Sequence, residues 1–278
     1  MENVRQSSSL WNGIGVVLGA GRELVASLVG RNLKIRYKGS ALGFFWSLLT
    51  PLCFIGIYAV FAHLLKFAAS SPRYLPYLVS GIVAWQFTVG SLMDSLYCIN
   101  GNANLVKKVF FPRVILPLST ALANLVNYLL TFAVLLLYLA VSGQLRLAHC
   151  WLLPPALAMH FALCLGLCCL CGTSNVFFRD TEHIVGVVSQ AWFFATPVMY
   201  PMAFQLDFLP DKAAWLAYLN PMTGILALYR AAILGMPVQP GGAAGMAGIA
   251  VSCFACLAVM WLGMRALRAG DAKFGDVL

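Results

Sequence analysis

The sequence places one short group of acidic and basic side chains where acid-base or metal chemistry would be possible, between residues 179 and 183. Asp180, Glu182 and His183 follow one another closely, directly after Arg179. Carboxylates and an imidazole are the side chains that bind zinc or transfer protons. However, the group stands between two apolar runs, where a solvated turn with local ion pairs and helix caps is more common. We therefore predict neither a catalytic nor a metal-ligating residue here.

Three other ionisable residues lie inside apolar runs: His63, Asp94 and His160. In ion-coupled carriers such residues mark relays, because a charge inside a membrane is costly unless it has a function. Asp94 is the main candidate, but it lies near the end of its run, where it can reach lipid headgroups or hydrogen-bond a neighbour. We favour structural pairing over a proton relay.

Four cysteines cluster in one apolar run: Cys164, Cys168, Cys169 and Cys171. Cys164 and Cys168 share a helix face, but the other two point elsewhere, and no histidine or carboxylate lies among them. Soft metal ions do bind thiolates. Packing of small apolar side chains is the better interpretation.

The sequence contains no Gly-Lys pair, and therefore no Gly-x-x-x-x-Gly-Lys-Ser/Thr phosphate loop. We expect no cofactor in this chain. If ATP drives its activity, a partner subunit must bind the ATP and magnesium.

The elements that position these residues must lie in lipid. Of the 278 residues, 61% are hydrophobic and only 10% are charged, whereas about 25% of the residues in a soluble domain are charged. The formal charge of +9 might suggest a nucleic-acid partner. Because the basic residues lie between apolar runs, we assign them to a membrane surface instead and expect no nucleic acid.

Six segments are long and apolar enough to be helices that cross a bilayer, which needs about 20 residues. They are residues 42–65, 75–99, 114–141, 150–172, 184–200 and 243–264. The stretch 202–240 is interrupted by prolines, and its apolar pieces are too short to span. We expect it to re-enter the membrane or to lie at the outer interface, either as a lid or as an anchor. The fold class is thus an all-α integral membrane protein.

With the N-terminus placed inside, 13 of the 18 Lys and Arg residues flank the cytoplasmic ends of the six segments. The positive-inside rule then predicts that both termini are cytoplasmic.

Residues 20–38 predict an amphipathic helix that lies among the lipid headgroups before the first span. Glu23, Ser27, Arg31, Lys34 and Lys38 fall on one face of a helical wheel, whereas leucine and valine occupy the others. The helix either anchors the chain or transmits a push to the first span.

The loop 100–113 on the same side predicts a short helix with an apolar surface that includes Phe110 and Phe111 between Lys107, Lys108 and Arg113. Such a surface suits docking of a soluble partner. An ordinary basic loop against headgroups is the alternative.

Aromatic side chains are frequent in the expected spans. Most belong to packing or to interfacial belts, but a subset could stack on sugar rings. The candidates for a carbohydrate path are Phe44, Trp46, Tyr58, Trp85, Phe87, Trp192, Phe193 and Tyr200.

Several motifs resemble those of the type-2 ABC exporter permeases for polysaccharides, such as O-antigen, capsule and teichoic acid. The resemblance rests on Arg31-Asn-Leu-Lys34-Ile-Arg36-Tyr37-Lys38-Gly39-Ser40-Ala-Leu-Gly43 with Trp46 and Pro51, on Gly81 with Trp85, on Asn104 to Lys108 with Phe111-Pro112-Arg113 and Leu116-Pro117, on Phe178-Arg179-Asp180, on Pro197 with Tyr200-Pro201, and on Asn220-Pro221-Met222-Thr223. These matches run in family order from about residue 22 to 235. The cysteine-rich segment is not part of the pattern.

The resemblance implies a single ABC-2 type domain over 1–278, a homodimer around a channel and a separate ATPase subunit in a bacterial cytoplasmic membrane. It implies that the ATPase contacts Arg31, Lys34, Arg36, Tyr37 and Lys38, and that the coupling helix contains Asn104, Lys107, Lys108, Phe111, Pro112 and Arg113. The outer gate would include Asn220, Pro221 and Tyr229. The implied substrate is a polysaccharide on an undecaprenyl pyrophosphate carrier.

Two other functions remain open from the residues alone. A membrane transferase for lipid-linked sugars would need Asp180, Glu182 and His183 as acid-base groups. An ion-coupled carrier would need Asp94.

Overall fold

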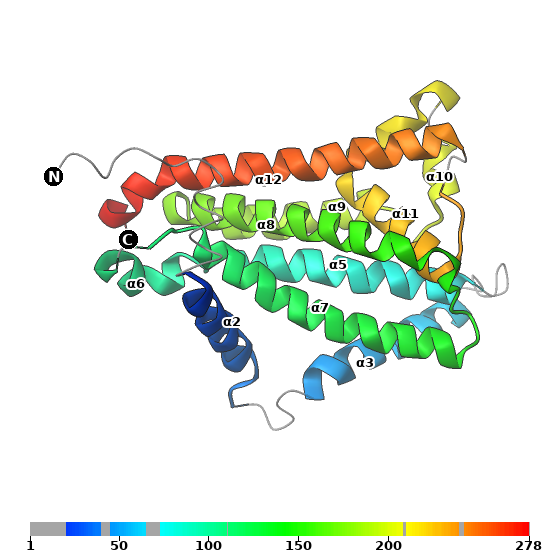
Figure 1. Cartoon of the computed structure of the whole chain (residues 1–278). Coiled ribbons are helices and arrows are strands. Elements are labelled where there is room, and N and C mark those ends of the chain that lie inside the picture. The colour runs from blue at the N-terminus through cyan, green and yellow to red at the C-terminus, as the bar shows by residue number, and fades with distance from the viewer. Residues whose placement is uncertain are drawn as a thin grey trace.

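The structure is a computed structural model that describes residues 21–39, 45–64, 73–109, 111–207, 210–238 and 242–277. All regular elements in these ranges are helices, and the longest run side by side in an elongated bundle (Figure 1). One end of the bundle, which we call the α6 end, carries α2 (Gly21–Tyr37), α6 (Ala103–Lys108) and the C-terminal part of α12 (Ala243–Val277). The other end carries α10 (Met202–Leu206), and we call it the α10 end.

Four helices of the described chain are long and apolar enough to cross a membrane. They are α5 (Tyr74–Leu96), α7 (Ile115–Val141), α8 (Leu153–Phe177) with the short turn before it, and α12. Each of the four overlaps most of a segment expected from the sequence. Their hydropathy therefore confirms a multi-pass membrane protein.

Two expected spans differ from the rest. The first corresponds to α3 (Trp46–Leu64); the expected start at residues 42–44 lies outside the described ranges. The fifth, expected at 184–200, is α9 (Thr181–Ala195), which ends well before the expected boundary. Pro197 prevents its continuation. Its 15 residues reach about 22 Å, less than the roughly 30 Å of a bilayer core.

Two helices are longer than expected at the α6 end. α8 ends at Phe177 rather than at 172, and α12 ends at Val277 rather than at 264. Both extensions are stabilised by packing, because Phe274 is fully buried and stacks on Phe177 at 5.9 Å between ring centroids. Mean hydropathy falls in this part of α12, so a composition argument ends the helix too early.

The region 202–240 folds as α10, the 3-10 helix η4 (Asp211–Leu219) and α11 (Pro221–Leu234). Almost every residue of α11 is buried, and it packs against α5, α8, α12 and η3 (Leu147–Leu152). Asn220 caps its start by accepting a hydrogen bond from the amide of Met222, and Gly235 ends it in the left-handed conformation, with φ of 63°. The helix thus enters the bundle instead of lying on its outside.

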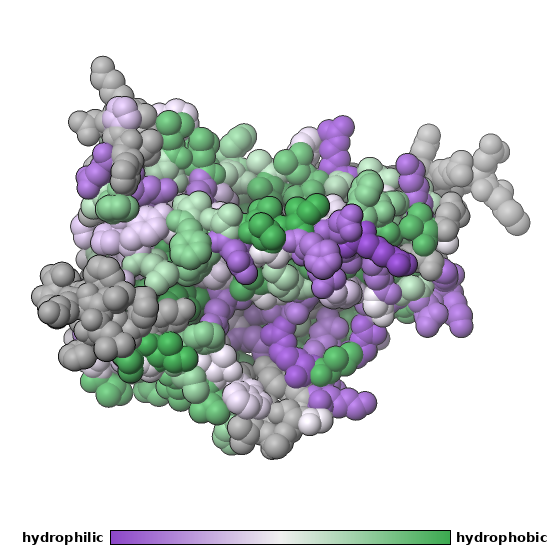
Figure 2. All heavy atoms as spheres, turned by 180° about the vertical axis from the view of Figure 1, so that it is seen from behind, coloured by the Kyte–Doolittle hydropathy of each residue, from purple (hydrophilic) through white to green (hydrophobic). Residues whose placement is uncertain are grey.

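Side chains of α5, α7, α8 and α11 form the main hydrophobic core. A second cluster at the α6 end joins Leu28 of α2 to α6, α8 and α12 through Val106, Cys169 and Leu267. Figure 2 shows that hydrophilic residues gather toward the α6 end of the face in view, while apolar residues cover much of the middle.

Candidate functional site

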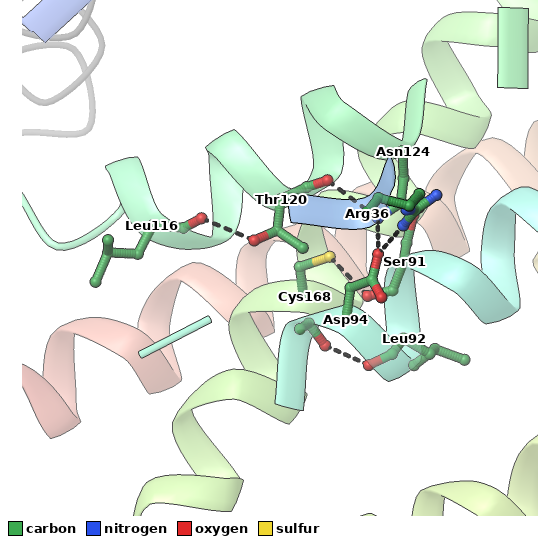
Figure 3. Close-up of polar contacts among 9 residues, drawn as sticks. Arg36, Ser91, Leu92, Asp94, Leu116, Thr120, Asn124 and Cys168 are labelled. Carbon is green, nitrogen blue, oxygen red and sulfur yellow. Dashed lines mark hydrogen bonds and ion pairs between the residues drawn. The ribbon is translucent and has the colours of Figure 1, made fainter. Parts of the chain in front are cut away.

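The polar cluster that holds α2 against the bundle is the first part of the candidate site (Figure 3). The guanidinium of Arg36 forms an ion pair with Asp94 of α5 and donates to Oδ1 of Asn124 on α7 at 2.9 Å. Asn124 in turn donates to Asp94 at 2.8 Å. The predicted structural pairing of Asp94 is therefore present, and three helices meet at this point.

A second contact joins α2 to the turn before α6. Arg31 donates to Oδ1 of Asn102 at 2.5 Å, and Asn102 donates to the carbonyl of Cys98 at 2.7 Å. A cavity of about 590 Å³ lies between α2, α5 and α7, with Arg31, Arg36, Asp94 and Asn102 in its wall. Both arginines thus reach the bundle, and Arg31 of the basic face contacts protein rather than headgroups.

The remaining candidates near the end of α2 are exposed or lie outside the described set. Lys34 and Lys38 are exposed, and Ile35 is 61% exposed. The side chain of Tyr37 lies outside the described set. An exposed apolar side chain beside exposed lysines suits either a headgroup layer or a soluble partner.

α6 is a single short helix that presents its charges outward. Asn104, Lys107 and Lys108 are exposed, and Pro112 is half-buried. Phe111, in contrast, is only 8% exposed and belongs to the second hydrophobic cluster. The sequence interpretation of Phe111 as part of an exposed apolar surface is therefore wrong. The side chain holds the loop to the core instead. Phe110 lies outside the described ranges.

Arg113 ties the end of this loop to α12. Its Nε lies 3.4 Å from Oδ1 of Asp271, and its guanidinium stands 4.9 Å from the ring centroid of Phe111. Asp271 lies in the part of α12 that the sequence did not predict as helix. The loop and the end of α12 therefore form one surface.

The group at 179–183 covers the turn between α8 and α9 and the first residues of α9, and Asp180, Glu182 and His183 are all exposed. Tyr97, just after α5, donates a hydrogen bond of 2.5 Å to the carboxylate of Glu182. This bond raises the pKa of the Tyr97 phenol above its usual value, since the bond is lost when the phenol ionises. Glu182 thus joins two helices at the α6 end.

His160 lies in the centre of the main core rather than near a surface. It is fully buried, its Nε2 lies 2.9 Å from Oγ1 of Thr88, and Phe87, Tyr128 and Tyr229 surround its ring. His63 is in α3, but its side chain is not among those described. Cys164, Cys168 and Cys169 are fully buried free thiols, and Cys171 is half-buried.

The aromatic candidates separate into two groups. Trp85 and Phe87 are buried in the core, against the sequence interpretation of both as channel residues, because each is covered by other helices of the same chain. Trp192 and Phe193 of α9 are half-buried and pack on Trp85, each at 5.5 Å between ring centroids. Trp46 is exposed and Tyr200 is half-buried. Phe44 and the side chain of Tyr58 lie outside the described set.

The gate candidates meet where α9 ends and α11 begins. Asn220 accepts a hydrogen bond from Nε1 of Trp192 at 2.9 Å and donates to Oγ1 of Thr196 at 2.9 Å. Pro221 is half-buried at the first position of α11, and Tyr229 is 2% exposed. Asn220 is thus the joint between the two helices.

Sequence reasoning missed the part that Arg230 plays at the α10 end. Its guanidinium is 5% exposed and donates to the carbonyls of Pro197 at 2.8 Å and Val198 at 3.0 Å. An arginine within the otherwise apolar run 222–234 was the available signal.

Comparison with known proteins covers the elements described above. Residues 23–234, from α2 to the end of α11, match the family model described as "ABC-2 type transporter". Two proteins of Klebsiella pneumoniae named "O-antigen export system permease protein RfbA" are 32% and 31% identical over 75% of this chain and 79% of their own length. One of the same name from Myxococcus xanthus is 34% identical over 76% of this chain and 80% of its own.

Proposed function

The chain belongs to the ABC-2 type transporter family, and from this premise we propose that it is the membrane subunit of an ATP-driven exporter of a cell-surface polysaccharide. The observation that carries the proposal is the likeness to three O-antigen export permeases over about three quarters of this chain. In the proposed assembly the chain lies in a bacterial cytoplasmic membrane with both termini in the cytoplasm.

A separate ATPase subunit supplies the energy, because the sequence has no phosphate loop of its own. It docks at the α6 end, where Asn104, Lys107 and Lys108 are exposed on one short helix. The end of α12 is part of the same surface through the contact between Arg113 and Asp271. Exposed lysines at a contact rim favour association with an acidic partner.

Movement of the docked ATPase reaches the membrane through α2. Arg31 contacts the turn that leads into α6, and Arg36 contacts α5 and α7. A displacement of α6 is therefore passed to α2 and to two spans by polar contacts with defined geometry. These contacts support α2 as a mechanical element in addition to a membrane anchor.

Two copies of the chain form the channel, as a long polar chain needs a continuous path rather than a small pocket. Trp46, Trp192, Phe193 and Tyr200 remain candidates for lining it, because none of them is fully buried. Aromatic faces of this kind stack on sugar rings. The substrate we propose is a polysaccharide carried on undecaprenyl pyrophosphate.

The joint at Asn220 acts as the outer gate. Its side chain holds the end of α9 to the start of α11. α11 is a separate short helix, because Asn220 caps its start and Gly235 ends it. A change in the angle between α9 and α11 would open or close the path at the α10 end.

Copurification tests the proposal. The full chain, solubilised from its native membrane, should retain an ATPase with a phosphate loop. Lys107→Glu with Lys108→Glu should release that ATPase, because both charges are exposed and reversing them leaves the fold intact. Asp207→Lys, a charge reversal on an exposed residue near the α10 end, is the matched control and should keep it. Recovery of the wild-type chain without any ATPase would reject the two-subunit model.

A further inference from the structure

A second cavity, of about 310 Å³, lies at the α10 end, far from the α6 surface. Its wall is formed by the first residues of α5, by the turn after α9 and by α11, and it includes Arg73, Tyr77, Pro197, Thr223, Arg230 and Met236. None of the residues proposed for docking, coupling, channel lining or gating is among those that line this cavity. The cavity therefore requires its own explanation.

Arg230 brings a positive charge to the wall of this cavity. The side chain is 5% exposed, and three backbone carbonyls accept from its terminal nitrogens: Pro197, Val198 and Tyr77, the last at 3.3 Å. The ring of Tyr77 covers the guanidinium at 3.3 Å from its centroid. These contacts fix the side chain firmly, and Gly81 leaves room for it, because a Cβ at residue 81 would stand 2.7 Å from Nη2.

The charge of Arg230 has no carboxylate partner among the described residues. The ion pairs between described residues are Arg36 with Asp94 and Arg113 with Asp271, and both lie at the α6 end. Carbonyl oxygens carry only partial charge, and a buried cation without a counter-ion is unfavourable. The exposed Arg73 adds a second positive charge to the same wall. The cavity is therefore suited to an anion.

Two buried polar atoms of the cavity residues lack a hydrogen-bond partner within the described structure. They are Nε of Arg230 and Oγ1 of Thr223, whose side chain is 1% exposed. Nε is a donor, and the hydroxyl can donate as well. Buried polar groups are rarely left unpaired. Both atoms could therefore donate to an acceptor that binds in the cavity.

We propose that this cavity binds a phosphate-type oxyanion. Phosphate offers several acceptor oxygens, as the cluster of Arg230 and Thr223 requires, and guanidinium groups match its geometry. The volume is ample for such a group, since one water molecule occupies about 30 Å³. Ala227, Met236 and Pro237 in the same wall would contact a carbon chain attached to the phosphate. The anion is either the headgroup of a phospholipid or free phosphate.

This inference does not depend on the export function, since it concerns only binding at the α10 end. The test measures binding to the purified full chain in neutral detergent micelles, by native mass spectrometry and by the shift in thermal unfolding. The probes are dihexanoyl phosphatidic acid, inorganic phosphate and, as a neutral comparison, dihexanoylglycerol, which is the same lipid without its phosphate.

We expect saturable binding of phosphatidic acid and none of dihexanoylglycerol. Thr223→Val should weaken the affinity about tenfold, the usual effect of losing one hydrogen bond to a charged group. It should leave the fold intact, because the lost hydroxyl has no protein partner. Thr131→Val on α7, the same chemical change away from the cavity, is the matched control and should not alter binding. Arg230→Lys, which keeps the charge but removes Nε, should also weaken it.

Competition by inorganic phosphate would identify free phosphate as a sufficient ligand, whereas binding of phosphatidic acid alone would identify a lipid headgroup. Either result supports the proposal. Absence of saturable binding, or binding that Thr223→Val and Arg230→Lys leave unchanged, would overturn it.

Discussion

Arg36 of α2 and Asp94 of α5, 58 positions apart in the sequence, form an ion pair that Asn124 of α7 completes with hydrogen bonds to both. The pair joins the helix before the first span to two helices of the bundle. A residue that sequence patterns mark as a possible ion relay thus has a structural partner.

Exchanging the two charges should separate a structural role from a relay. Arg36→Asp and Asp94→Arg alone should each impair export, because each places like charges together. The double exchange should restore it. Since the two side chains are 36% and 44% exposed, their coupling free energy should not exceed about 1 kcal/mol in a double-mutant cycle of thermal unfolding.

Lys34→Glu, on the same helix but in no ion pair of the described residues, is the control and should not be rescued by Asp94→Arg. If Asp94→Asn abolishes transport and the double exchange restores nothing, an ion-coupled carrier becomes the better interpretation.

Phe111→Ala should unfold the α6 end instead of merely weakening docking. The ring is buried among Leu28, Val106 and Phe274, and removing a buried phenylalanine costs about 3–5 kcal/mol. Thermal unfolding of the purified chain measures the loss. Lys107→Ala, a truncation of an exposed side chain on the same loop, should change the stability by less than about 0.5 kcal/mol. Equal stability of the two variants would contradict the burial of Phe111.

Gly263→Ala should strongly destabilise the contact between α8 and α12. A Cβ at this position would lie 2.2 Å from the carbonyl oxygen of Gly166, and a backbone atom cannot rotate away. Overpacking costs about 1–3 kcal/mol where side chains can move, so a larger loss is expected here. Thermal unfolding again provides the measurement.

Gly186→Ala in α9 is the matched control. Nothing lies within 4 Å of the Cβ it would gain, so it should stabilise its helix by about 0.5–1 kcal/mol. A loss of stability at 186 as large as at 263 would show that the close approach of α8 and α12 is not the cause.

Asn220→Ala should loosen the joint between α9 and α11. It removes the acceptor of Trp192, the donor to Thr196 and the cap of α11, and loss of a cap alone costs about 1 kcal/mol. Export should fall, and proteolysis near residue 196 should become faster. Asn220→Asp keeps the acceptor and the cap, so it should retain more activity. Equal loss in both variants would assign the effect to the bonds that Asn220 donates to Thr196 and to the carbonyl of Ala195.

Neutral substitutions in the turn at 179–183 should leave export unchanged. Asp180→Asn and His183→Gln alter exposed side chains. A polysaccharide on the surface of cells that depend on this permease can be followed by gel electrophoresis. Complete loss with each variant would favour the membrane transferase, which needs these groups as acid and base.

Hydropathy predicted the four long spans because the bilayer demands about 20 apolar residues whatever the neighbours are. The helix at 21–37 was predicted from its amphipathic pattern instead. The hydropathy argument failed at α9 and at the end of α12. α9 is stopped by Pro197, and the polar end of α12 stays helical because Phe274 packs against α8. Local composition contains no information on such contacts.

The amino-acid sequence by itself determined that the chain lies in a membrane, that it carries a basic helix and a basic loop at one side, and that it resembles a known exporter family. Only the tertiary structure decided which side chains face one another. Phe111 and Trp85 became core residues, Asp94 gained Arg36, and Arg230 reached the wall of a cavity. The physical reason is that the preference of a segment for lipid or water depends on its own residues. Which side chains 30 or more positions apart come into contact depends on how the helices pack.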